Sequence, residues 1–343
     1  MAEMEVRGGD SQGFGHVPVL LDEVLAMLRP MPGETAVDAT LGMGGHAVEM
    51  ARLLGAGGRI IGFDLDSEHL SEVQGRFAQL AAKGGRGPEA DSEAAGRGLA
   101  ELTCVHGSFV GAPAYLRQHG VEADVFLADL GFSSTQMDDP TRGLSFRASG
   151  PLDMRLDRSR GMTAAALVNE LDEKSLSDLI FRCGEEPYAR KIARKLAQYR
   201  KIRTIDDTTT LARLVREAYG PRARDSRIDP ATRTFMALRI AVNDELGALQ
   251  NLLQQLELEA SRLASDQTDH GARGWLRRGA RVGLISFHSL EDRMVKQSLR
   301  RMELAGHADL LSRGPITAEP AEISRNPRAR SAKLRGARIG ASP

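Results

Sequence analysis

The chain has 343 residues, of which 41% are hydrophobic and 27% are charged, and its formal net charge is zero. These values are ordinary for a globular protein with one large domain and a smaller one. The two cysteines, Cys104 and Cys183, have no C-x-x-C partner, which argues against a disulfide framework or a cysteine-ligated zinc. The sequence shows neither a signal-peptide pattern nor an apolar run of membrane-spanning length, so we expect a cytoplasmic protein with no membrane partner.

The two halves of the chain carry opposite charges. Residues 1–150 contain 11 Lys and Arg against 21 Asp and Glu, whereas residues 151–343 contain 35 against 25. A basic half on a neutral chain favours a polyanionic partner, because Lys and Arg bind phosphates. Solvated helix faces would explain the same charge equally well.

The first half of the chain alternates strand and helix patterns. Residues 1–15 are predicted to be disordered, and Lys83–Gly98, which lacks apolar periodicity, is predicted to be a flexible surface loop. The predicted strands are Thr35–Thr40, Arg59–Asp64, Glu101–His106 and Val121–Leu130. Helices are expected over Asp22–Leu28, Ala47–Leu54 and Ser67–Ala82. This alternation predicts a parallel sheet with helices on both faces.

The second half is helical for about a hundred residues before a strand returns. The predicted helices are Thr163–Leu171, Lys174–Cys183, Glu186–Arg200, Thr208–Ala218 and Thr232–Leu256. A strand over Arg281–Phe287 and a helix over Leu290–Glu303 follow. We therefore predict a doubly wound, mostly parallel α/β sheet formed by residues 16–140 and 245–343. Residues 141–244 are predicted to be an inserted all-helical domain.

A glycine-rich turn follows the first predicted strand, in the segment DATLGMGGH from Asp38 to His46. Its glycines, Gly42, Gly44 and Gly45, let the backbone approach a ligand, and the next helix contributes a partial positive charge. In open α/β sheets, ligands bind at the carboxyl ends of the strands. The turn is therefore a candidate cofactor site, although structural turns also use glycine freely.

An acidic residue, Asp64, ends the second predicted strand, where it can accept hydrogen bonds from the two hydroxyls of an adenosine ribose. A helix N-cap is the competing interpretation, although Ser67 could fill that role. The turn and Asp64 together fit either a dinucleotide or S-adenosylmethionine. Asp38 favours S-adenosylmethionine, because methyltransferases carry an acid at this place near the methionine moiety. His46 and the missing helix-packing glycine favour it too, because they make a poor cradle for a pyrophosphate.

The segment that follows the fourth predicted strand, together with six other segments, matches the sequence pattern of a known family. The sequence resembles the MraW family of small-subunit ribosomal RNA (cytosine-N4) methyltransferases, which have the class I, Rossmann-like methyltransferase fold. The resemblance rests on seven blocks in the same order along the chain. They are residues 16–20 and 38–46, residues 129–155, residues 230–235 and 237–243, and residues 286–293 and 326–335.

The resemblance implies roles for particular residues. Cofactor contacts are implied at Gly44, Gly45, His46, Asp64, Phe109, Asp129 and Gln136. It also implies that the helical insertion helps to hold RNA, and that the target is a decoding-region cytosine in 16S rRNA of the small ribosomal subunit. The chain departs from the family at Asp229, where His is usual, and at Phe132 and Thr135, where Val and Pro are commoner.

The proton acceptor for the target amine is not identified by the sequence. Asp129 is the nearest carboxylate by position, and Asp153 and His288 are further candidates. For Asp153, a salt bridge with Arg155 is at least as good an interpretation. For His288, a hydrogen-bonded structural role competes with a role as base.

Basic segments in the second half are candidate phosphate contacts. The segment Arg325–Arg338 carries six basic residues and no acid, and Arg190–Lys195 forms a basic helix face. A methyltransferase of the same fold acting on DNA or protein, and a non-catalytic RNA-binding protein, are the alternatives. We expect 16S rRNA as the partner, no DNA and no metal, and the sequence does not decide between a monomer and a homodimer.

Overall fold

The computed structural model describes residues 18–83, 98–131, 134–223, 226, 228–265 and 273–340. The predicted disordered tail, residues 1–15, and most of the predicted loop, residues 84–97, lie outside the described residues. The chain divides into two compact units, unit 1 within residues 1–131 and 250–343, and unit 2 within residues 132–249. The corresponding boundaries expected from the sequence were 140/141 and 244/245.

Unit 1 is built on a seven-stranded sheet with the order β3-β2-β1-β4-β5-β7-β6. The strands are β1 Thr35–Asp38, β2 Arg59–Asp64, β3 Glu101–His106, β4 Ala123–Asp129, β5 Leu276–Ser286, β6 Ala308–Leu310 and β7 Lys333–Ile339. Strands β1 to β5 pair in parallel, and β7 runs antiparallel to both β5 and β6. The doubly wound, mostly parallel sheet predicted from the sequence is therefore confirmed.

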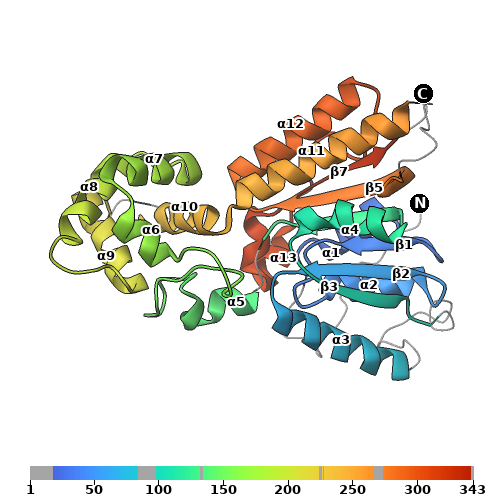
Figure 1. Ribbon diagram of the computed structural model, residues 1–343, viewed down its shortest axis with the longest axis horizontal. Helices are drawn as coiled ribbons and strands as arrows, with labels where there is room; N and C mark the ends of the chain where they lie inside the picture. The colour runs from blue at the N-terminus through green and yellow to red at the C-terminus, as the bar shows by residue number, and fades with distance from the viewer. Residues whose placement is uncertain are drawn as a thin grey trace. The chain divides into compact units, whose positions relative to one another are not determined.

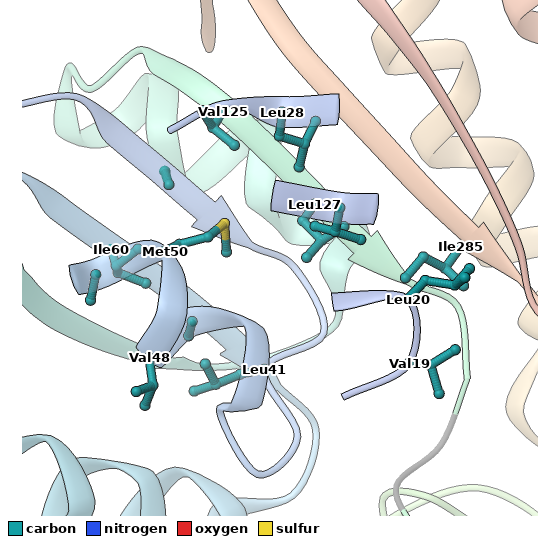
Figure 2. Close-up of a cluster of buried hydrophobic side chains, with 14 of the residues drawn as sticks. Val19, Leu20, Leu28, Leu41, Val48, Met50, Ile60, Val125, Leu127 and Ile285 are labelled. Carbon is teal, nitrogen blue, oxygen red and sulfur yellow. The ribbon is translucent and has the colours of Figure 1, made fainter. Parts of the chain in front are cut away.

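Helices lie on both faces of this sheet (Figure 1). Their bounds are α1 Leu21–Leu28, α2 Gly45–Leu54, α3 Ser67–Ala82, α4 Ala112–His119, α11 Glu245–Ala264, α12 Ser289–Leu304 and α13 Pro320–Arg325. Buried side chains of α1, α2 and α3 join the sheet in one core, in which Met50 of α2, Ile60 of β2 and Leu127 of β4 belong to the same cluster (Figure 2). Phe126 is next to Leu127 in β4, and adjacent residues of a strand face opposite sides of the sheet. Phe126 therefore lies on the other side from this core and packs against Trp275, with ring centroids 5.3 Å apart.

The basic C-terminal segment forms part of the sheet. Strand β7 lies between β5 and β6, and its inward residues, such as Leu334, are fully buried. Two of its cations share one partner, because Lys333 Nζ is 3.1 Å and Arg335 Nε is 2.7 Å from the carboxylate of Asp292. Lys333 and Arg335 therefore neutralise an acid within unit 1, and the phosphate contacts expected of the segment Arg325–Arg338 stay a prediction.

Unit 2 is helical. Its helices are α5 Ser134–Asp138, α6 Ala164–Glu170, α7 Glu173–Gly184, α8 Ala189–Tyr199, α9 Thr208–Tyr219 and α10 Ala231–Asn243. Apolar residues at helical spacing, such as Ile192 and Leu196 of α8, form its core, while Arg190 and Arg194 on the other side of α8 are exposed. The prediction of a single helix over Thr232–Leu256 is wrong. The segment forms two helices, because the left-handed backbone of Asp244 (φ 48°) ends α10 before α11 begins.

The unusual Asp229 has a structural role. Its carboxylate accepts three hydrogen bonds from Arg216, the shortest of them 2.8 Å, and accepts the backbone N–H of Ala231 at 2.9 Å. Burial raises the pKa of Asp229, but the hydrogen bonds and the charge of Arg216 outweigh it and hold that pKa below its ordinary value. Asp229 therefore joins α9 to the start of α10.

Over the described part of the chain, no helix is both long and apolar enough to cross a bilayer.

Candidate active site

Three carboxylates lie at the carboxyl ends of adjacent strands. Asp38 ends β1, Asp64 ends β2 and Asp129 ends β4, and the sheet order places β2, β1 and β4 side by side. The chain leaves β1 toward β2 on one side and returns to β4 on the other, so β1 and β4 flank the topological switch point. This is where open α/β sheets bind ligands.

The carboxylate of Asp64 holds the glycine turn to the end of β2. Its Oδ2 accepts the N–H of Gly42 at 2.7 Å, and its Oδ1 accepts the N–H of Asp66 at 2.8 Å. A carboxylate has about four acceptor positions, so capacity remains for two hydroxyl donors. The side chain that caps α3 is Asp66, which accepts from the N–H of Glu68, and neither Asp64 nor Ser67 has that role.

The turn allows no side chain at Gly44 or Gly45. A Cβ on Gly44 would lie 2.7 Å from Val73 Cγ1, and the φ of Gly44 is +73°. A Cβ on Gly45 would lie 2.4 Å from Pro18 Cγ. Close packing against these two neighbours holds the N-terminus of α2 near the ends of the strands.

Gly44→Ala is expected to destabilise the protein, because both the left-handed backbone and the contact with Val73 oppose a methyl group. The left-handed conformation alone costs about 1–2 kcal/mol. Gly75→Ala, on the neighbouring α3, meets nothing within 4 Å and is expected to stabilise by roughly 0.5–1 kcal/mol. Thermal unfolding of both variants measures these two stability changes. A Gly44→Ala variant as stable as the wild-type protein would contradict the packing argument.

Asp38 and Asp129 are linked through Thr40. The N–H of Thr40 donates to Asp38 Oδ1 at 3.2 Å, and the N–H of Asp129 donates to Thr40 Oγ1 at 2.6 Å. Burial, together with the charge of Asp64, raises the pKa of Asp38 to about 7. Burial, together with the charges of Asp38 and Glu291, raises the pKa of Asp129 to about 7. This end of the sheet therefore concentrates negative charge away from water.

The chemistry of this donor set fits S-adenosylmethionine. Among the described residues, Asp129 Oδ1 is buried and accepts no hydrogen bond. Buried carboxylates that lack a cation are costly, and a nearby positive charge relieves that cost. S-adenosylmethionine brings a sulfonium and an ammonium group, whereas the pyrophosphate of a dinucleotide would add two negative charges.

Glu291 belongs to this acidic cluster and was not identified from the sequence. It is 2% exposed, and its charge raises the pKa of Asp129. It forms a capping box with His288 at the start of α12, where His288 Nδ1 accepts the N–H of Glu291 at 3.4 Å. An acid three residues after a capping side chain is the sequence signal for this motif. Since His288 Nε2 also lies 3.2 Å from Glu291 Oε1, both ring nitrogens of His288 face that residue.

Asp153, the remaining candidate base, lies in unit 2 and is held by arginine. Arg155 donates to both of its oxygens, at 2.7 Å and 2.9 Å. Burial raises the pKa of Asp153, but the hydrogen bonds and charge of Arg155 outweigh it and keep that pKa below its ordinary value. This geometry is that of the salt bridge considered from the sequence, and it makes Asp153 a weak base.

The other predicted cofactor residues have varied surroundings. His46 is 7% exposed, and its Nε2 lies 3.0 Å from the carbonyl oxygen of Val19. Phe109 opens the short turn η1 (Phe109–Gly111) after β3 and is half-buried. Gln136, on α5 of unit 2, is 6% exposed. Their roles toward the cofactor stay predictions.

Comparison with known proteins identifies the family. The MraW methylase family matches residues 13–339. A protein from Sorangium cellulosum named "Ribosomal RNA small subunit methyltransferase H" is 44% identical over 95% of this chain and 91% of its own length. Proteins with the same name from Acidobacterium capsulatum and Koribacter versatilis are 44% and 43% identical, each over 94% of this chain. The matched regions span 97% of the Acidobacterium capsulatum protein and 94% of the Koribacter versatilis protein. The chain therefore belongs to the MraW methylase family, which confirms the methyltransferase activity and the methyl donor S-adenosylmethionine predicted from the sequence.

Proposed function

We propose that this protein methylates the N4 amine of a cytosine in 16S rRNA, in the decoding region of the small ribosomal subunit. The observation that carries the proposal is the pair of carboxylates Asp38 and Asp129 at the switch point of the sheet, whose charged forms a cationic methyl donor would stabilise. The names of the relatives, which refer to small-subunit ribosomal RNA, support the substrate class.

We assign the cofactor contacts to the three strand ends and the turns beside them. Asp64 accepts the ribose hydroxyls, and Asp38 lies where it can neutralise the methionine ammonium group. Gly42, Gly44 and Gly45 would let the backbone approach the ligand, and His46, Phe109 and Gln136 would be further contacts. When bound, S-adenosylmethionine supplies a methyl group on a positively charged sulfur.

Asp129 is the proposed proton acceptor. The exocyclic amine of cytosine is a poor nucleophile, since its lone pair is delocalised into the ring, and a hydrogen bond to a carboxylate raises its electron density. A carboxylate whose pKa is about 7 accepts a proton more readily near neutral pH than an ordinary aspartate does. Arg155 weakens Asp153 as a base, and His288 is engaged by Glu291, so both rank below Asp129.

The assay that tests the proposal offers radiolabelled S-adenosylmethionine with naked 16S rRNA, isolated small subunits or a protein extract. Digested nucleosides are then identified by mass spectrometry. We expect N4-methylcytidine in rRNA. Label in protein, or at another atom, would keep the methyltransferase assignment but overturn the substrate. Binding of rRNA without transfer would support a non-catalytic role.

The exposed basic face of α8 is a proposed phosphate contact. Arg190 and Arg194 are exposed, and Arg194 has only a loose ion pair, 3.7 Å from Glu173. The double variant Arg190→Gln/Arg194→Gln is expected to bind 16S rRNA more weakly. The slope of log affinity against log salt should flatten by about 1.4–1.8, because two phosphate contacts are lost. An unchanged slope in filter-binding titrations would remove this face from the RNA interface.

A further inference from the structure

Unit 2 contains a small pocket that is distinct from the strand ends of unit 1. It has a volume of about 260 Å³, and its lining residues lie at the start of α8, the end of α9 and the start of α10. Figure 1 labels these three helices. Its lining includes Pro187, Tyr188, Tyr219, Ile228, Asp229 and Arg233. This volume lies just below the usual range for drug-sized ligands, so the pocket suits one small planar group.

One buried carboxylate binds the side chain of one tyrosine of this pocket and the backbone of the other, and the two rings pack against each other. Glu186 is fully buried, and it accepts the hydroxyl of Tyr219 at 2.7 Å and the backbone N–H of Tyr188 at 2.8 Å. The two rings lie 4.6 Å apart at 59°, and both residues are half-buried. Because the rings are held in place before any ligand arrives, binding against them costs little conformational entropy.

Three exposed cations lie around the pocket. Lys191 Nζ lies 5.4 Å and Arg222 Cζ lies 5.9 Å from the centre of the Tyr188 ring, and both side chains are exposed. Arg233, which lines the pocket, is exposed too. The acid of the lining, Asp229, is paired with Arg216 at 2.8 Å. A ligand therefore meets two aromatic rings bordered by cations.

We propose that this pocket holds one unstacked base of the substrate RNA against Tyr188 and Tyr219, while Lys191, Arg222 and Arg233 bind the flanking phosphates. Single-stranded RNA is held in this way, by stacking of bases on aromatic rings and by cations along the backbone. The inference rests on the proposed rRNA substrate and adds a second contact point for that RNA, within unit 2.

Tyr188→Leu tests the stacking, because leucine keeps apolar volume and removes the aromatic ring. Tyr199→Leu is the matched control. Tyr188 is the N-cap of α8, and Tyr199 is the half-buried last residue of that helix, with Arg213 Cζ 5.5 Å from its ring, but it does not line the pocket. We expect Tyr188→Leu to bind 16S rRNA roughly 5- to 150-fold more weakly than the wild-type protein. Tyr199→Leu should bind RNA normally, and S-adenosylmethionine affinity should be unchanged in both variants.

Equal RNA affinities for Tyr188→Leu and Tyr199→Leu would overturn the proposal that the pocket binds an RNA base. Ultraviolet cross-linking of the wild-type protein to 16S rRNA gives a second measurement that needs no variant. Cross-links on peptides that contain Tyr188 or Tyr219 support the proposal, and cross-links confined to other peptides overturn it. If the wild-type protein methylates rRNA but loss of the Tyr188 ring leaves RNA affinity unchanged, only the proposal for the pocket fails. If the wild-type protein neither binds nor methylates rRNA, the proposed function fails with it.

Discussion

Asp64→Ala is expected to weaken S-adenosylmethionine binding by about 100-fold or more. The variant loses the acceptors for the two ribose hydroxyls, and each hydrogen bond to a charged group contributes roughly 1.5–3 kcal/mol. It also releases the N–H of Gly42, which Asp64 Oδ2 holds at 2.7 Å, so the glycine turn loses its connection to β2. Isothermal titration calorimetry measures the affinity directly.

Asp66→Ala is the matched control for this variant. Asp66 lies two residues further on and caps α3 through the N–H of Glu68, so its loss should cost roughly 0.5–2 kcal/mol of stability. Its cofactor affinity should stay close to that of the wild-type protein. If Asp64→Ala binds S-adenosylmethionine as tightly as Asp66→Ala does, the ribose assignment is wrong.

Asp129→Asn is expected to stabilise the protein without cofactor at pH 8 and to slow methyl transfer by roughly 100- to 10,000-fold. Burial and neighbouring acids raise the pKa of Asp129 to about 7 in the folded state. A carboxyl whose folded pKa is raised contributes stability that is fully present below its unfolded pKa, about 4, and lost as the pH rises through 7. Asparagine does not titrate, so the variant should gain up to ~4 kcal/mol at pH 8 and little at pH 4.

Denaturant unfolding of the cofactor-free protein between pH 5 and pH 8 measures this difference. Asp172→Asn is the control, because hydrogen bonds from Ser175 lower the pKa of Asp172 and move its titration below that range. The control should therefore follow the wild-type profile. An Asp129→Asn profile that runs parallel to the wild-type profile would show that Asp129 does not titrate near neutrality.

Elements with a local signal were predictable from the sequence. The bounds of β2, α3 and β3 are as predicted, because each combines a clear apolar pattern with an acid or a glycine at its end. The alternation of strand and helix likewise placed Asp64 at the end of a strand, and Asp38 and Asp129 within two residues of the ends of theirs. The cofactor contact of Asp129, in contrast, was implied only by the resemblance to the family.

Elements that depend on distant partners were missed. Strand β7 has alternating apolar residues, but Lys333 and Arg335 made its segment a candidate for phosphate contacts, and the acid that neutralises them is on α12. The break at Asp244 has no glycine or proline to mark it. The pKa values of Asp38 and Asp129 follow from burial and from one another, and they were therefore accessible only from the structure.

The position of β7 also has a consequence for biosynthesis. In the sheet it separates β5 from β6, although it follows both of them in the chain. During translation, the edge of β5 that points away from β4 therefore has no partner until the last strand has left the ribosome. Exposed edges of this kind pair readily with other chains. We thus expect chains interrupted before Lys333 to aggregate or to be degraded, so that methyltransferase activity appears only after synthesis has passed β7.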